Sequence, residues 1–327
     1  MKEKFSLFKL FSHKSITKDD EFAEIPTNFK GFFVMFGRKF WNLSNLSLLY
    51  TFFNLPFLFI FLAYALMDEV TVVGSPMHAA YYSFYHISDS VVIKSLFPFV
   101  SGFSSTHVPS TATYVLLCIA ALGIFTFGLS NAGSAYIIRG YNRGDPVFLI
   151  SDFFSTIKRN WKQALVVGVI DIFLIIVLVY DFLFWNQGGF LNGIFQYFAL
   201  FLCVLYFFMR YYIYTILITF DLSIYKIFKD AFLLSFLGFK RNLLALFGIA
   251  FVVIANMYLC ILYIPIGIML PIILTIGVVM FISGYASYPV IKKYMIDPYY
   301  DENPDENPDN YYDGEDGDDE VVFEDRG

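Results

Sequence analysis

Residues 163–184 read QALVVGVIDIFLIIVLVYDFLF, an apolar stretch in which Asp171 and Asp181 are the only charged residues. At a helical rise of 1.5 Å per residue, a helix of this length reaches about 33 Å, which is enough to cross a hydrocarbon core of about 30 Å. The stretch therefore predicts a transmembrane helix. Asp171 lies well inside it, where a charge is costly and calls for a partner.

Five further apolar blocks are long enough to span a bilayer. With the first, they predict an all-α polytopic membrane protein, a six-helix transmembrane bundle over residues 47–291. The other blocks run over about 47–67, 113–136, 194–219, 243–263 and 265–289. Little more than Tyr263 and Pro265 separates the last two, so we expect a tight antiparallel hairpin with Pro265 in its first helical turn.

The composition also favours a membrane protein. Apolar residue types make up 58% of the chain and charged types 15%, against about 25% charged residues in soluble domains. A soluble fold would leave large apolar patches exposed, which argues against that class. The first 46 residues are too long, polar and basic for a cleaved signal peptide, so the first span is expected to act as an uncleaved targeting signal.

The basic residues lie almost entirely on one side of the predicted spans. Of the 22 Lys and Arg residues, 20 fall before the first span or after the second, fourth or sixth. By the positive-inside rule we expect this side, with both termini, in the cytoplasm and the chain in the cell membrane. Of the other two bases, Lys94 lies in the outer segment 68–112 and Arg210 inside a span. Because the bases flank spans, they indicate no nucleic-acid partner.

The two ends of the chain differ in charge. Residues 1–46 form a basic segment that is expected to lie on the membrane as an amphipathic helix. Residues 297–327 hold 14 of the 28 acidic residues, whereas residues 1–296 carry 21 bases and 14 acids, a net charge of +7. We expect 292–327 to be an acidic, disordered cytoplasmic tail. Besides the lipid bilayer, we expect a protein partner that binds through this tail or the cytoplasmic loops.

Three hairpins share a plan, in which basic and aromatic residues precede an outgoing and a returning helix. The three starts read Arg38-Lys39-Phe40-Trp41-Asn42, Lys158-Arg159-Asn160-Trp161 and Lys240-Arg241-Asn242. Two explanations stay open. The recurring asparagine, and the amphipathic stretch before the last two starts, favour weak parallel repeats. The basic residues alone are explained by the need of any span for a positive inner flank and an interfacial Trp.

Residues 129–168 read LSNAGSAYIIRGYNRGDPVFLISDFFSTIKRNWKQALVVG. This block resembles the YesL-like family of bacterial multi-pass membrane proteins, a domain family of unknown function. The resemblance rests on Arg143, Gly144, Asp145, Asp152, Phe153, Phe154, Asn160, Trp161, Lys162, Gln163 and Ala164. It extends loosely over about residues 30–295, and the long outer segment and the acidic tail depart from it. The resemblance implies a membrane protein, with some members encoded beside carbohydrate-uptake genes, and supplies no catalytic residues.

Polar residues at membrane depth form the candidate site. Asp171 and Arg210 lie about 12 and 15 Å from the cytoplasmic ends of the third and fourth spans, which a short outer loop joins. Either charge alone would cost about 2.5–3.5 kcal/mol, so we expect an Asp171–Arg210 ion pair, with Asn256 of the fifth span in the same network. Two interpretations stay open: a ligand or proton site in the bundle, or an ion pair that fixes helix packing.

No other pattern indicates catalysis. His78, His86 and His107 have spacings that fit no standard metal motif, and the three Cys residues lie in apolar blocks as small filler. The chain has no Ser-His-Asp order and no HExxH, Walker or GxGxxG pattern. We therefore predict no enzymatic activity, no metal site and no cofactor.

Local features lead to four further expectations. Gly144-Asp145-Pro146 is typical of a turn, and Asp152 is expected to cap the next helix. The small-residue run 130–135 should allow close helix approach. Pro271 should kink the sixth span, with neighbouring groups satisfying the freed carbonyl.

Two functions are compatible with these patterns. Our first hypothesis is an accessory or scaffold component of a transport or envelope system, carbohydrate uptake among them. It is motivated by the basic and aromatic cytoplasmic face, the acidic tail and the absence of an enzymatic motif. The alternative is a small-solute transporter with a buried polar site around Asp171, Arg210 and Asn256.

Overall fold

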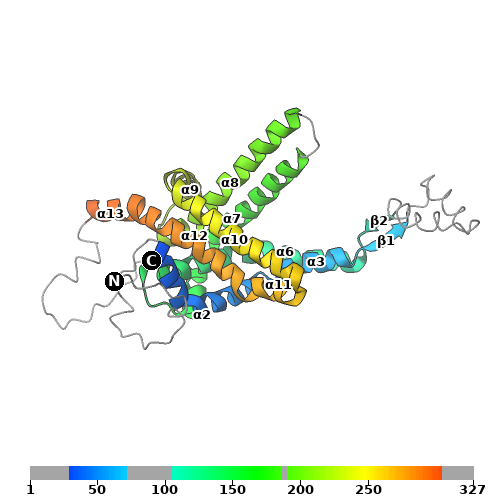
Figure 1. The fold of residues 1–327 in the computed structure, drawn as a ribbon, viewed down its shortest axis with the longest axis horizontal. Helices are drawn as coiled ribbons and strands as arrows, with labels where there is room; N and C mark the ends of the chain where they lie inside the picture. Colours follow the sequence, from blue (N-terminus) through cyan, green and yellow to red (C-terminus); the bar gives the residue numbers. More distant parts are fainter. Residues whose placement is uncertain (1–28, 72–104, 186–189, 304–327) are drawn as a thin grey trace, which may run out of the picture.

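The computed structural model describes residues 29–71, 105–185 and 190–303. The predicted all-α class is confirmed for these residues, in which the only sheet is a two-stranded ladder (Figure 1). Five of the described helices are long and apolar enough to cross a membrane, and a bent pair would add a sixth. The predictions for the first 28 residues, for most of the outer segment and for the tail from residue 304 fall outside the described residues. The predicted start of the disordered tail is wrong, because residues 292–302 are helical and continue the last long helix.

The elements follow one another along the chain with few gaps. They are α2 (Phe29–Phe53), the short helix η2 (Leu55–Phe57), α3 (Leu58–Ala65), β1 (Asp68–Thr71), β2 (Ser105–Val108), α6 (Thr111–Arg143), α7 (Leu149–Phe184), α8 (Phe190–Thr219), α9 (Ile224–Leu237), α10 (Phe239–Leu262), α11 (Ile264–Leu270), the π turn η3 (Pro271–Thr275), α12 (Ile276–Ile291), the π turn η4 (Lys292–Ile296) and α13 (Asp297–Glu302). The strands β1 and β2 pair antiparallel, with Asp68 opposite Val108. They join α3 to α6 at one end of the molecule (Figure 1).

The first predicted span, 47–67, is part of a longer helix that is broken. α2 begins well before it, and α3 continues after η2 at an angle of 60°. The break falls at Pro56, which has no backbone N–H to continue the helical hydrogen bonds. Asn54 holds the break, because its side-chain amide donates to the carbonyl of Tyr50 at 2.9 Å and to Oγ of Ser130 on α6 at 2.8 Å.

Pro271 begins a π turn in the last long helix, at the point where the sequence predicts a kink. The chain from 264 to 301 runs on as one apolar helix that contains the π turn η3. Proline and a π turn both leave carbonyls without their usual helical donors. The hydroxyls of Ser44 and Ser47 on α2 donate to the carbonyls of residues 271–273 at 2.9–3.2 Å. Side chains of the first helix thus satisfy the backbone of the last.

α6 and α7 make the most extensive contact between two helices in the described chain. Gly128 and Gly168 face each other so closely that a Cβ on Gly128 would lie 2.7 Å from the Cα of Gly168. Farther along α6, Gly133 lies against the ring of the buried Phe153. The small-residue run 130–135 therefore does allow the close approach that such residues permit between membrane helices.

The turn between α6 and α7 has the predicted geometry. Gly144 ends α6 with φ 84°, a left-handed conformation that glycine adopts without strain. Arg143 and Asp145 flank it as an ion pair of 3.3 Å. Asp152 is not the N-cap that the sequence predicts, because α7 begins at Leu149 with Phe148 before it. Asp152 lies in the first turn, where its carboxylate accepts a hydrogen bond of 2.8 Å from the N–H of Phe148.

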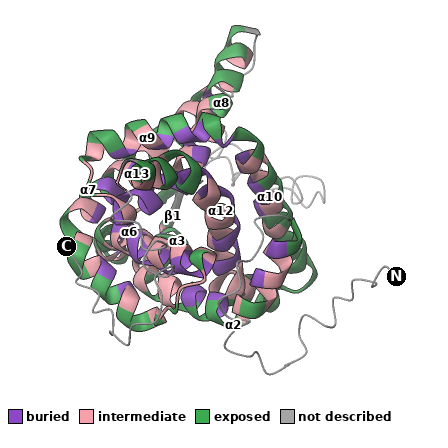
Figure 2. Ribbon diagram, turned by 90° about the vertical axis from the view of Figure 1, so that its left-hand side faces the viewer, coloured by how far each residue is buried: buried purple, intermediate pink, exposed green. Residues whose placement is uncertain are grey.

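The α7–α8 hairpin divides into an inner half, which contains Asp171 and Tyr206–Ile218, and an outer half, which contains the end of α7 near Asp181 and the start of α8 near Tyr197. The inner half packs against the rest of the bundle, and most residues of α8 from Tyr206 to Ile218 are buried. The outer half projects away from the other helices (Figures 1 and 2). Its apolar side chains are exposed, with Leu191 67% and Tyr197 74% exposed. Such a surface suits lipid, whereas the inner half forms the protein core.

Candidate functional site

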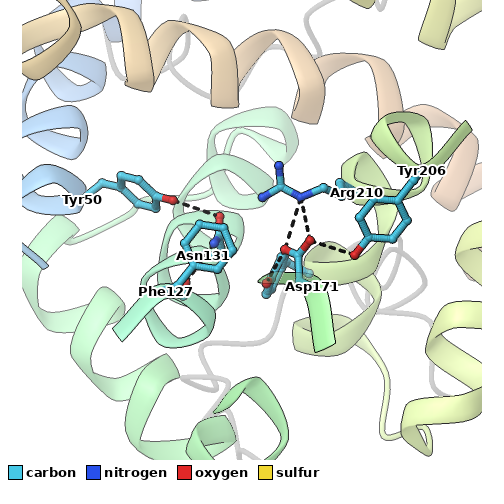
Figure 3. A network of polar contacts seen from close by, with 7 residues as sticks. Tyr50, Phe127, Asn131, Asp171, Tyr206 and Arg210 are labelled. Atoms are coloured by element: carbon cyan, nitrogen blue, oxygen red, sulfur yellow. Dashed lines mark hydrogen bonds and ion pairs between the residues drawn. The ribbon is translucent and has the colours of Figure 1, made fainter. Parts of the chain in front are cut away.

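Asp171 of α7 lies in the centre of the inner half with none of its surface exposed. Its carboxylate accepts hydrogen bonds from the hydroxyls of Tyr206 and Tyr214, each at 2.8 Å. The Nε of Arg210 lies 3.0 Å from one carboxylate oxygen and 3.2 Å from the other. The predicted Asp171–Arg210 ion pair is therefore confirmed, and two tyrosines complete it (Figure 3).

The sequence analysis missed both tyrosines, although the sequence contains a signal for them. Tyr206, Arg210 and Tyr214 are spaced four residues apart on α8, so they lie on one helix face. A helix with donors at this spacing can surround a single carboxylate on its neighbour. A buried charge is tolerated only when it is paired and hydrogen-bonded, which explains why three donors meet at Asp171.

Only the Nε side of Arg210 is used by Asp171. The two terminal nitrogens point away from the carboxylate (Figure 3) and make no hydrogen bond or ion pair with any described residue. The guanidinium lies over the ring of Phe127, with 5.6 Å between Cζ and the ring centroid. The Arg210 side chain is 27% exposed, and this surface faces a cavity inside the bundle.

The cavity of about 70 Å³ lies between α6, α8 and α12. Its lining is Asn131, Ser134, Ala135, Ile138, Arg210, Tyr211, Tyr214, Thr215, Met280, Ser283 and Gly284. More than half of these side chains carry a polar atom. Drug-sized ligands occupy roughly 300–1,000 Å³, so only a compact ligand or a few waters would fit.

Six buried side-chain atoms have no hydrogen-bond partner in the described part of the chain. They are one atom each of Thr51, Asn54, Ser134 and Tyr211, and both amide atoms of Asn142. Ser134 and Tyr211 line the cavity and are only 2% and 7% exposed. A buried polar atom without a partner costs about 1–3 kcal/mol, so such atoms gather where water or a ligand binds.

A polar contact continues the site toward the first helix. Asn131 of α6, which lines the cavity, accepts a hydrogen bond of 3.5 Å from the hydroxyl of Tyr50 on α2 (Figure 3). The cavity lies in the part of the bundle where three long helices meet and where a fourth, α7, supplies the counter-charge. Residues from α2, α6, α7, α8 and α12 thus build one site.

Asn256 does not join this site, which corrects the sequence-based expectation. Its side-chain amide donates to the carbonyl of Gly267 at 3.2 Å, and its oxygen accepts from Thr275 at 3.4 Å. Pro271 has no N–H, so the carbonyl of Gly267, four residues earlier, loses its helical donor. Asn256 replaces that donor. Its role is to stabilise the backbone around the π turn at Pro271, because α10 packs on α11, η3 and α12.

The comparisons with known proteins give one match. The family described as "Protein of unknown function, DUF624" matches residues 109–182. No curated protein and no solved structure matches the chain. The matched segment contains α6 and most of α7, and therefore Asn131, Ser134 and Asp171, but not Arg210.

All residues that carry the YesL-like resemblance fall inside the segment similar to DUF624, and several of them make contacts between helices. Phe153 packs against Gly133, and the carbonyl of Ala164 lies against Gly128. Gln163 donates to the carbonyl of Leu222, which ties α7 to the start of the loop before α9. These three contacts do not involve Asp171 or the side chains bonded to it, so this part of the pattern reflects the packing of the helices.

The structure offers no metal site in the residues it describes. No group of three or more His, Cys, Asp or Glu side chains in these segments is placed to hold an ion. His107 lies in β2, and its ring is 6.0 Å from that of Tyr64 between centroids. His78 and His86 fall outside the described residues.

Proposed function

We propose that the chain is a small-solute transporter that binds a compact polar solute at Arg210 in the core of the bundle. The observation that carries this proposal is the way Arg210 is held. Asp171 takes the Nε side, while the terminal nitrogens face a cavity whose lining includes Ser134 and Tyr211, two residues with buried hydroxyls that have no partner in the described chain. An ion pair that served packing alone would be expected to have all of its donors satisfied within the protein. The unused terminal nitrogens of Arg210, which face a cavity, therefore favour a binding site for a ligand.

The broken helices support the same proposal. Transporter sites commonly lie near the bilayer midplane, where helices are interrupted. The first span is broken at Pro56, the last contains a π turn that begins at Pro271, and α2 packs on this π turn. Interruptions of this kind allow helices to move relative to one another without losing backbone hydrogen bonds, because side chains satisfy the freed groups.

We propose further that the protein is a bacterial cell-membrane protein with both termini in the cytoplasm. The distribution of basic residues supports this orientation. A YesL-like identity is supported by the overlap between the block at 129–168 and the segment 109–182 that is similar to DUF624. Fusion of a reporter that is active only in the cytoplasm, such as green fluorescent protein, to each end would test the orientation, and a dark fusion would contradict it.

Transport is tested with the purified full chain in liposomes. Entry of urea, acetamide, glycerol and glycolate would be followed by osmotic light scattering or radiolabel, with empty liposomes as the baseline. We expect at least one solute to enter faster than the baseline, and Arg210→Gln to remove the difference. Asp181→Asn, in the outer half, is the matched control and should transport normally. Equal rates in protein-containing and empty liposomes for every solute would contradict the proposal.

The double change Asp171→Asn with Arg210→Gln separates the two interpretations of the ion pair. If each single change abolishes transport and the neutral pair restores it, the charges serve packing only. If the double variant folds but stays inactive, the charges act on the solute.

The accessory role stays a prediction, because most of the acidic tail that motivates it lies outside the described residues. Affinity purification from native membranes would compare the full chain with a version that ends at Asp297. A stoichiometric partner that is lost with the tail would support the accessory role.

A further inference from the structure

We infer that the solute is a short monocarboxylate of about the size of acetate, and that it binds together with one proton. This inference rests on the proposed solute site at Arg210 and names its substrate class. Three features of the cavity carry it: the donors that face it, its size and its charge.

The donors suit a carboxylate. The two terminal nitrogens of Arg210 form a planar fork that matches the two oxygens of a carboxylate. Asp171 fixes this fork by holding Nε, and the ring of Phe127 supports the guanidinium from its face. Ser134 and Tyr211 line the same cavity, and their buried hydroxyls lack partners among the described residues.

The size of the cavity limits the length of the acid. An engineered cavity of about 150 Å³ accepts benzene, which has six heavy atoms. A cavity of about 70 Å³ therefore accepts about three heavy atoms, and because it is partly open, a ligand with the four heavy atoms of acetate is the closest match. Ala135, Ile138 and Met280 provide apolar contacts in the lining, which suit a methyl group beside a carboxylate.

The charge of the site calls for a proton. Asp171 and Arg210 balance each other, and no other charged residue lines the cavity in the described chain. The titratable groups around the pair are neutral tyrosines: Tyr50 from α2, and Tyr206, Tyr211 and Tyr214 from α8. The lining residues from α6 and α12 are not titratable. A carboxylate alone would leave a net charge of −1 inside the membrane, where uncompensated charge is disfavoured.

Two carboxylates that share one cation hold a proton between them more readily than either does alone. Binding therefore takes up one carboxylate and one proton from water, and the net charge of the site does not change. The proton stays within the group formed by Asp171, Arg210 and the bound acid.

The test measures proton uptake during binding. The full-length chain in detergent would be titrated with acetate at pH 6.5 by calorimetry in two buffers that differ in ionisation enthalpy. Acetamide, a neutral molecule of the same shape, is the comparison. We expect acetate to bind at least ten-fold more tightly than acetamide, with about one proton taken up per acetate. We expect Arg210→Gln to weaken acetate binding at least 100-fold and Asp181→Asn to change neither quantity.

Asp171→Asn sharpens the test. This change leaves the Arg210 charge without its counter-charge, so acetate should bind with no proton uptake. Ser134→Ala is a milder variant, which should weaken acetate binding several-fold and keep the uptake of one proton. If Asp171→Asn does not fold, the proton count of the native chain and of Ser134→Ala decides the question.

Each outcome has a distinct meaning. Binding of acetate without proton uptake by the native chain would overturn the coupling. Binding of acetamide as tight as that of acetate would overturn the carboxylate class, while the proposed solute site would stand. If neither binds, and the liposome assay detects transport of a larger solute such as glycerol, this inference fails and the proposed function does not.

Discussion

Asp171 and Asp181 lie on the same helix, in the inner and outer halves of the α7–α8 hairpin, and the two halves use them differently. Asp171 is fully buried and bonded to three side chains of α8. Asp181 is partly exposed, and its carboxylate accepts one hydrogen bond of 3.0 Å from Nε1 of Trp185, one turn farther along its own helix.

The opposite helix accounts for this difference. In the inner half, α8 presents two hydroxyls and a guanidinium to α7. In the outer half, Phe195 of α8 stacks on Trp185, with 4.6 Å between ring centroids. The same residue type therefore becomes part of a buried site or a local contact at the helix end according to what its neighbour supplies. This contrast provides matched pairs of variants for experiments.

The largest effect is expected for Asp171→Asn. It breaks a buried ion pair and leaves Arg210 uncompensated, so the free energy of unfolding should fall by about 3–5 kcal/mol. Asp181→Asn should change it by about 0.5 kcal/mol or less. Thermal unfolding of the two variants in the same detergent measures the difference. If both variants lost the same free energy of unfolding, the structure would be wrong in placing only Asp171 in a buried ion pair.

The second effect concerns the glycines of the two halves. In Gly168→Ala the new Cβ would lie 2.4 Å from the Cα of Gly128, so α6 and α7 must move apart, at a cost of about 3 kcal/mol. In Gly193→Ala, in the outer half, the new Cβ meets no atom within 4 Å. That variant should be as stable as the native chain or slightly more stable. A tolerated Gly168→Ala would contradict the close helix contact.

A third and smaller effect is expected for the tyrosines. Tyr214→Phe removes one hydrogen bond to the buried carboxylate of Asp171 and should cost about 2 kcal/mol, as hydrogen bonds to charged groups do. Tyr197→Phe, on the exposed outer half of α8, should leave the unfolding temperature unchanged. The comparison fails if both changes have the same effect on thermal unfolding.

The smallest effect is expected for Trp185→Phe. It removes the bond to Asp181 but keeps an aromatic ring against Phe195, so the loss should be about 0.5 kcal/mol or less. Thermal unfolding of Trp185→Phe and Tyr214→Phe under the same conditions compares the two losses in stability. If Trp185→Phe lowered the free energy of unfolding as much as Tyr214→Phe does, Trp185 would have to make contacts that this structure does not show.

Much of the fold could be predicted from the sequence, because local chemistry sets it. The turn at Gly144 and the irregular helix at Pro271 both follow from the backbone properties of single residues. The Asp171–Arg210 pair could also be predicted, since both charges lie at similar depth on helices joined by a short loop. The prediction that Asn256 joins the Asp171–Arg210 network was wrong, because the depth of a residue along its span does not tell which neighbouring helix its side chain faces.

The sequence by itself determined that the chain is a bundle of long apolar helices with charges inside it. That conclusion depends only on helix rise, bilayer thickness and the cost of exposing apolar surface to water. The tertiary structure alone decided that Tyr206 and Tyr214 complete the Asp171 site, that the terminal nitrogens of Arg210 face a cavity, and that Asn256 stabilises the backbone around a π turn. These facts depend on the rotation of each helix about its axis and on its neighbours, and both are set by packing across the whole bundle.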